Sequence, residues 1–223
     1  MKKTLFILIV LFCFLIIGYK LFFYLDHQSE IREKSKHKEI TRLTTGELNL
    51  IREGDFILRK GFGFFSDFIS KNLNDSIIDV THAGIIIKER DSLFVIHSLS
   101  SDVSDIDGVQ IQSLDTFLSY SAPNKIIITR AKNCDTICGK NIAERAQFYL
   151  EKEIPFDHNG NYDDDDELYC TEMIWNILEK DLKTTTIPTD PEARKDFFFS
   201  MIPMYDTTYF DIIINQYESV NTK

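Results

Sequence analysis

Positive charge is scarce in this sequence, and so are repeats. The 223-residue chain carries 25 Lys and Arg against 35 Asp and Glu, a formal net charge of −10. Nucleic-acid-binding proteins usually present a basic stripe or patch, so this balance argues against a general nucleic-acid binder. No internal repeat or low-complexity segment appears. A hydrophobic content of 43% then leaves room for one domain with a substantial core.

The N-terminus lacks the small-residue cleavage site that ends a secretory signal. Two lysines precede an apolar run from Leu5 to Leu25, which only Lys20 interrupts. About 20 apolar residues span a bilayer, and no A-x-A-like site follows the run. We therefore expect residues 1–25 to be an uncleaved signal anchor, with a cleaved signal peptide as the alternative. Basic residues lie on both sides of the run, so its orientation stays open.

The rest of the chain divides at a change of composition. Residues 26–45 are polar and rich in charge, which indicates a stalk or a first helix. We expect residues 46–223 to form the folded domain.

Cysteine is scarce, with four in the chain. Cys13 belongs to the apolar run. A structural zinc site needs about four ligands, and no matching Cys/His cluster lies near Cys134 and Cys138. Free thiols or a local disulfide are therefore expected there. Cys170 is left without an obvious partner, and an odd thiol in an exported protein calls for an explanation.

The pattern of apolar residues predicts a mixture of helices and strands. β-branched or alternating runs predict strands, and apolar residues at helical spacing predict helices. Strands are expected at 52–61, 80–89, 92–100, 108–113 and 125–131 and within 201–219, and helices at 62–74, 141–153 and 167–181, with another capped at Ser113 or Asp115. The central strands are joined by tight turns, which predicts an antiparallel α+β domain.

One cysteine lies where a nucleophile belongs. In "ELYCTEMIWNIL", Cys170 opens a helical pattern. Helix N-termini carry partial positive charge and lower the pKa of a thiol, and their N–H groups can bind an oxyanion. Cys170 is therefore a candidate nucleophile, with an ordinary buried thiol as the alternative.

A cysteine nucleophile needs a base and a group that orients the base. His82 begins one predicted strand and His97 ends the next, so the two can be cross-strand neighbours. His158, in the loop before Cys170, is the alternative base. His27 and His37 lie in the leader or stalk and are poor candidates.

Five segments together resemble a known family. In order along the chain they are "EGDFILRKG", "THAGIII", "FVIHS", "GVQIQSLDTFL" and "YCTEMIWNIL". They are similar to the YiiX/YebB-like branch of the NlpC/P60 superfamily over about residues 50–180. Ordinary members place the cysteine helix first, whereas here it comes last. The resemblance therefore implies a circularly permuted papain-like fold, with an antiparallel sheet packed against helices.

The resemblance also implies roles for individual residues. Cys170 would be the nucleophile and His82 the general base. The third polar position falls on His97, where relatives in this branch often carry an acid; a histidine there resembles the pattern of lecithin:retinol acyltransferase-like proteins. Tyr169 and Glu172 would shape and support the substrate site. Asp55 of the Gly-Asp pair is expected to fix a turn.

The predicted activity is that of a thiol hydrolase or acyltransferase. It would act on an amide or ester bond through an acyl-enzyme on Cys170, without a metal or organic cofactor. The substrate would be a cell-wall peptide or a lipid or acyl compound. We expect a catalytic domain exported into the cell envelope and held at the membrane, with secretion after cleavage as the alternative. A membrane-tethered domain that binds a lipid or peptide without catalysis is the competing function. Residues 181–200 are expected to cover the cleft.

Overall fold

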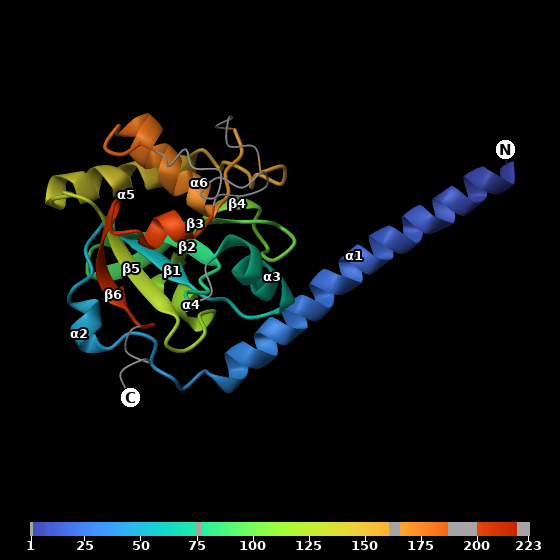
Figure 1. Ribbon diagram of the computed structural model, residues 1–223, viewed down its shortest axis with the longest axis horizontal. Coiled ribbons are helices and arrows are strands. Elements are labelled where there is room, and N and C mark those ends of the chain that lie inside the picture. Colours follow the sequence, from blue (N-terminus) through green and yellow to red (C-terminus); the bar gives the residue numbers. More distant parts are fainter. Residues whose placement is uncertain (1, 75–76, 161–165, 187–199, 218–223) are drawn as a thin grey trace.

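The computed structural model describes residues 2–74, 77–160, 166–186 and 200–217. At the centre lies a six-stranded sheet in the order β4-β3-β2-β1-β5-β6 (Figure 1). Every neighbouring pair of strands is antiparallel, which confirms the predicted α+β class. The strands are β1 (Phe56–Arg59), β2 (His82–Glu89), β3 (Ser92–Leu99), β4 (Gly108–Ser113), β5 (Ile126–Ala131) and β6 (Phe210–Asn215).

The helices lie around this sheet and along the N-terminal segment. They are α1 (Lys2–Lys36), α2 (Thr45–Leu48), α3 (Phe64–Leu73), α4 (Leu114–Ser119), α5 (Thr136–Glu151) and α6 (Cys170–Trp175). A π-helical segment, Asn176–Asp181, continues α6, and a 3-10 turn, Ile202–Tyr205, precedes β6. The helix that begins at Cys170 therefore follows β1–β5 in the chain, as a permuted order requires.

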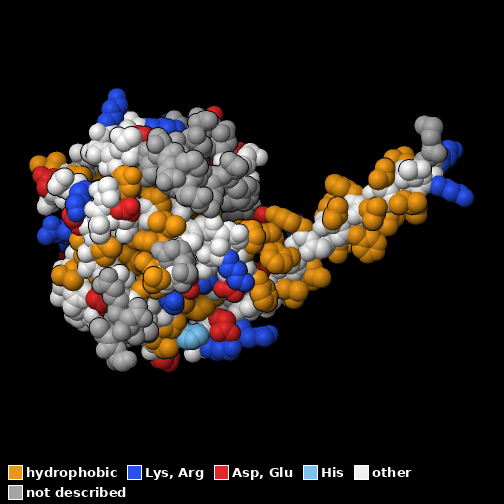
Figure 2. Space-filling model, in the orientation of Figure 1, with side chains coloured by type: hydrophobic (Ala, Val, Ile, Leu, Met, Phe, Trp, Pro, Cys, Tyr) orange, Lys and Arg blue, Asp and Glu red, His pale blue; other side chains and the backbone are white. Residues whose placement is uncertain are grey.

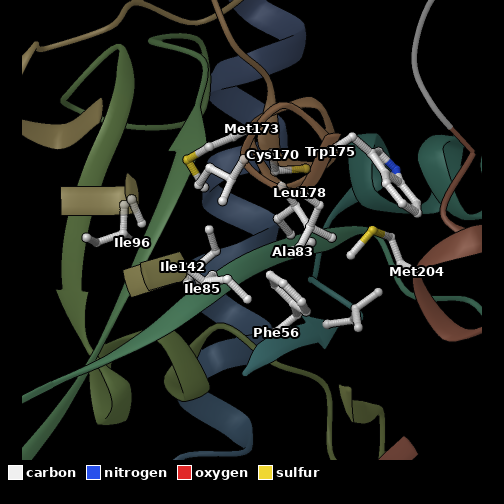
Figure 3. Packing of buried hydrophobic residues seen from close by; sticks show 14 of the residues in the cluster. Phe56, Ala83, Ile85, Ile96, Ile142, Cys170, Met173, Trp175, Leu178 and Met204 are labelled. Carbon is white, nitrogen blue, oxygen red and sulfur yellow. The ribbon is translucent and has the colours of Figure 1, made fainter. Parts of the chain in front are cut away.

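The two faces of the sheet bury separate apolar clusters. Side chains alternate between the faces along a strand, so Ala83 and Ile85 of β2 pack with α5 and α6. Ile86 points the other way and packs with Phe117 of α4. Figure 3 shows the first cluster, with Cys170 and Ala83 among its packed side chains. This arrangement sets the start of α6 against the start of β2.

Three predicted helices have different bounds in the structure, and the one expected at 62–74 is the shorter α3. α5 begins at Thr136 and not at 141, because the Asp135 side chain accepts hydrogen bonds from the N–H groups of Ile137 and Cys138 and caps the helix there. Cys134 and Cys138 form a disulfide across this cap. The helix expected from 167 begins only at Cys170. The helix after β4 is capped by Ser113, one of the two predicted residues.

α1 continues without a break from the apolar run into the polar segment, ending at Lys36. It projects away from the domain in Figure 1, and hydrophobic side chains cover the projecting part in Figure 2. The helix is long and apolar enough to cross a membrane, a property that signal sequences share. Around Phe23, which contacts Phe65, the helix lies against the domain beside α3. Most of the expected cleft-covering segment, 187–199, lies outside the described residues.

Candidate active site

Cys170 is the first residue of α6 and is buried between that helix and the sheet. Its thiol faces the N–H group of Ala83 in β2, along with the N–H groups of Thr171 and Cys170 itself. Backbone N–H donors therefore surround the sulfur. Such donors can stabilise a thiolate or an oxyanion that forms next to the sulfur.

The expectation of a lowered thiol pKa is wrong for this structure. Burial raises the pKa of Cys170, and the surrounding N–H groups and Arg59 offset only part of that rise. The resulting pKa is about 11. Desolvation penalises the thiolate more strongly than the start of a six-residue helix stabilises it. At neutral pH the resting residue is a protonated thiol, so it needs a base to become a nucleophile.

His82 and His97 meet across neighbouring strands, as their positions predicted. Nε2 of His82 lies 3.0 Å from Nδ1 of His97, and both residues are buried. Both rings also pack on Phe117 of α4, with centroid separations of 5.7 and 5.3 Å. The pair is therefore fixed by one hydrogen bond and a shared aromatic support.

Gly84 makes room for this pair. A Cβ atom at position 84 would lie 3.2 Å from Cβ of His97 and 2.4 Å from Cγ1 of Val95. A side chain there would push against β3 at the point where it carries the second histidine. The glycine of "THAG" is thus part of the site, and only the strand pairing reveals the reason.

Both imidazoles are neutral at neutral pH. Burial, followed by the charge of Arg59, lowers the pKa of His97 to about 3. The same causes, together with His97, hold the pKa of His82 well below its usual value. A neutral His82 can accept a proton. Because its Nε2 is bonded to His97, Nδ1 is the nitrogen left for the thiol.

Arg59 is a member of the site that sequence reasoning missed. It ends β1 directly opposite His82. Its guanidinium carbon lies 4.7 Å from the Phe117 ring centroid, and its Nη1 donates to the carbonyl of Tyr120 at 2.6 Å. Burial lowers its pKa to about 10, so it stays charged at neutral pH. The available signal was a cation ending a short apolar strand, "FILR".

A pocket of about 330 Å³ brings Cys170, His82, Arg59 and Tyr169 together. Half of its other lining residues are aromatic or aliphatic. Within the described residues Cys170 makes no direct hydrogen bond to His82, a contact that commonly tightens only with substrate bound. His97 stands behind His82 and is fully buried.

The remaining candidates divide between the pocket and its supports. His158 lines the pocket but is half exposed, and its Nε2 lies 3.2 Å from Asp107. Tyr169 lines the pocket and directly precedes Cys170 in the chain. Glu172 does not line it. Its carboxylate is fully buried and accepts a hydrogen bond from the N–H of Tyr169 at 3.1 Å, which supports the start of α6.

Asp55 has the structural role that its position predicted. Its carboxylate accepts hydrogen bonds from Nε and Nη2 of Arg130, at 2.7 and 2.8 Å, and from the N–H of Arg52 at 2.7 Å. These residues and Cys134 line a second, larger pocket of about 580 Å³. It contains none of the three proposed catalytic side chains, and its buried carboxylate is already paired, so it is a weaker candidate than the smaller pocket.

The ligand chemistry of the described residues gives no metal site. In the parts of the chain that the structure describes, no group of three or more His, Cys, Asp or Glu side chains could hold a metal ion.

Comparisons with known proteins agree with this fold. A family model described as "permuted papain-like amidase enzyme, YaeF/YiiX, C92 family" matches residues 51–194. The chain also resembles the crystal structure of metalloprotein yiiX from Escherichia coli O157:H7, with a TM-score of 0.58 and 16% identity. That likeness spans 74% of this chain and 97% of the other, and at such identity it shows the fold. No curated protein matches.

The family model spans well over half of the chain and includes His82, His97 and Cys170. The chain therefore belongs to the permuted papain-like amidases of the YaeF/YiiX, C92 family, which are cysteine hydrolases.

Proposed function

We propose that Cys170 is the nucleophile of this hydrolase, His82 its general base and His97 the residue that orients the base. The hydrogen bond between the two histidines, at the edge of the pocket that holds Cys170, is the observation that carries this proposal. We also place the family within the NlpC/P60 superfamily, on the order of its segments around the permuted cysteine helix.

The proposed reaction begins with a neutral thiol and a neutral imidazole. As the sulfur attacks the substrate carbonyl, its proton moves to Nδ1 of His82. His97 must then accept a hydrogen bond from Nε2 of His82, which places the proton of His97 on its own Nε2. The oxyanion of the tetrahedral intermediate is stabilised by the N–H groups around the sulfur and by the charge of Arg59.

The intermediate collapses when His82 returns the proton to the leaving amine or alcohol. The C–N or C–O bond breaks, and the acyl group remains on Cys170 as a thioester. Water then gives hydrolysis, and an acceptor amine or alcohol gives acyl transfer. The structural neighbour yiiX is called a metalloprotein, whereas in the described residues of this chain no group of three or more His, Cys, Asp or Glu side chains could hold a metal ion.

Among the two substrate classes, the pocket favours a lipid or acyl compound over a cell-wall peptide. Its walls include Phe62, Phe65, Val103, Phe156 and Met201. Apolar walls bind an alkyl chain by removing it from water. We place the domain in the cell envelope, held at the membrane by α1.

Trapping the acyl-enzyme tests the proposal. The full chain is mixed with 4-nitrophenyl butyrate, and intact mass is measured after rapid quenching. We expect a butyryl adduct on Cys170 that is absent in Cys170→Ala and strongly reduced in His82→Ala. His158→Ala, a histidine on the same pocket wall, is the control and should keep the adduct. A pocket that binds the ester without any adduct would instead support the non-catalytic binding domain.

A further inference from the structure

The N-terminal helix contributes a wall of the catalytic pocket. Four of its residues line the pocket with Cys170 and His82: Tyr19, Phe23, Asp26 and Glu30. Their spacings of four, three and four residues place them on one face of α1. The same helix that carries the exposed apolar segment therefore presents a continuous stripe to the active site.

Specific contacts hold this stripe against the domain. Asp26 is buried, and its carboxylate accepts hydrogen bonds from the N–H of Phe64 and, at 3.2 Å, from that of Phe65 at the start of α3. Gly63 has a φ of 92° and leaves room for that carboxylate, since a Cβ atom there would lie 2.5 Å from Oδ1 of Asp26. An acidic side chain at a helix start is stabilised by the N–H groups it faces.

The contacts continue toward the apolar end of α1. The ring centroids of Phe23 and Phe65 are 5.6 Å apart in an edge-to-face arrangement. The hydroxyl of Tyr19 donates to the carboxylate of Asp102, in the loop after β3. At the other end of the stripe, Glu30 lines the same pocket as Arg59. Burial raises the pKa of its carboxyl, and the charge of Arg59 offsets only part of that rise.

The position of the stripe fixes where the pocket opens. Most residues from Leu5 to Phe22 are apolar and exposed, and they lie in the part of α1 that could cross a membrane. Tyr19 and Phe23 belong both to the end of this part and to the pocket wall. Between Tyr19 and Asp26 the helix rises about 10 Å, so the apolar pocket adjoins the surface of any bilayer that α1 spans.

We propose that α1 completes the substrate site, so that a substrate with a long alkyl chain enters the pocket from the membrane along the face of Tyr19 and Phe23. The inference rests on the proposed function, because it takes Cys170 as the reacting atom. It assigns Phe23 as a residue that selects for chain length. The occupant is the alkyl chain of a membrane amphiphile whose amide or ester carbonyl reaches Cys170.

Chain-length preference can be measured without turnover. The full chain, with Cys13→Ala in every variant, is placed in phosphatidylcholine nanodiscs and treated with iodoacetamide or with N-hexadecyl iodoacetamide. The sulfur of Cys170 displaces iodide and forms a thioether, and its proton passes to His82 or solvent. Cys134 and Cys138 are paired in a disulfide, so Cys170 is the thiol that reacts. Intact mass gives the two rates and their ratio.

Phe22 and Phe23 provide a matched pair on the same helix, since only Phe23 lines the pocket. We expect Phe23→Ala to lower the ratio of hexadecyl to unsubstituted rates by about fivefold to tenfold. Phe22→Ala should leave it unchanged, and Phe23→Leu should restore most of it. Partition of the reagent into the bilayer is the same for all variants and cancels in the comparison. The iodoacetamide rate of each variant is the reference for its own ratio, and circular dichroism with a thermal melt shows separately that each variant is folded.

Equal ratios in Phe22→Ala and Phe23→Ala would overturn the role of α1. That failure is distinct from failure of the proposed function, which appears as an iodoacetamide rate that does not change in His82→Ala. A separate experiment tests whether the substrate enters from the bilayer. Hexadecyl reagent loaded into the protein's own nanodiscs should label Cys170 without delay, and reagent loaded into protein-free nanodiscs should label it only after a lag. Identical time courses would contradict access from the membrane.

Discussion

Nε2 of His82 lies 3.0 Å from Nδ1 of His97, so the proposed base is oriented by a second imidazole and not by a carboxylate. A carboxylate would stabilise an imidazolium by its charge, and a neutral imidazole can only position it. Burial, followed by the charge of the nearby Arg59, acts in the opposite direction and keeps both rings neutral. The site is therefore arranged for transfer of a proton between neutral groups, with positive charge available for the anionic intermediate.

Replacing His97 should separate positioning from binding. His97→Ala removes the hydrogen bond that orients His82, and we expect kcat with 4-nitrophenyl butyrate to fall about 100-fold with little change in KM. His97→Asp supplies an acceptor with a charge. It should restore part of kcat and move the acid limb of the pH profile upward, because a nearby carboxylate raises the pKa of His82. A loss of kcat equal in both variants, with no shift of the limb, would argue for a merely structural His97.

The stability of the fold should depend on pH through the same residue. The pKa of His97 is about 3 in the folded chain, against about 6.5 when it is exposed. Between these values the unfolded state binds more protons, so stability rises with pH across this window and is lost as pH falls. We expect the urea midpoint to decline from pH 7 to pH 4, and to decline less in His97→Gln, which cannot take up a proton. Parallel declines in the two proteins would assign the effect to other groups.

Much of the site follows from local pattern. The β-branched and apolar runs at 80–89 and 92–100, with a tight turn between them, are enough to place His82 beside His97. The apolar pattern after Tyr169 is enough to place Cys170 at a helix start. The direction of its pKa shift was not predictable in this way, because it depends on how deeply the rest of the fold buries the sulfur. The approach of Phe23 to Phe65 likewise depends on how α1 packs on α3, which helical periodicity alone does not specify.

The requirement for glycine at position 84 gives a sharp structural test. Gly84→Ala places a methyl group 2.4 Å from Cγ1 of Val95 and 3.1 Å from the carbonyl oxygen of Ile96, so β3 must shift. We expect a loss of about 1–3 kcal/mol in the free energy of unfolding. Because β3 carries His97, we also expect kcat to fall in the fraction that remains folded.

Gly46→Ala is the matched control, since the nearest atom to a Cβ at that position is 3.9 Å away. It should leave kcat unchanged and should not destabilise the fold, because Ala is a better helix former than Gly within α2. Urea denaturation and steady-state kinetics on both variants provide the comparison. A Gly84→Ala protein as stable and active as the control would show that the strands tolerate a side chain between the histidines.

Arg59 is the residue whose charge should most affect the chemistry. Arg59→Met keeps much of the side-chain volume against Phe117 but removes the guanidinium. The pKa of His82 should rise, because the cation that lowers it is gone, so activity should be lost at a higher pH on the acid side. The pKa of Cys170 should rise as well, since Arg59 lowers it. The oxyanion also loses a stabilising charge, and we expect kcat to fall about 10-fold to 100-fold.

The pH profile of kcat/KM distinguishes this electrostatic role from a loss of packing. Arg52→Met makes the same change of charge at an exposed position and should leave both limbs and kcat in place. Arg59→Lys retains the charge without the planar group that stacks on Phe117 and donates to Tyr120, so its acid limb should lie close to that of the unmodified chain even if kcat falls. If Arg59→Met lowers kcat while both limbs stay fixed, the guanidinium supports the fold of the site and its charge does not set the protonation of His82.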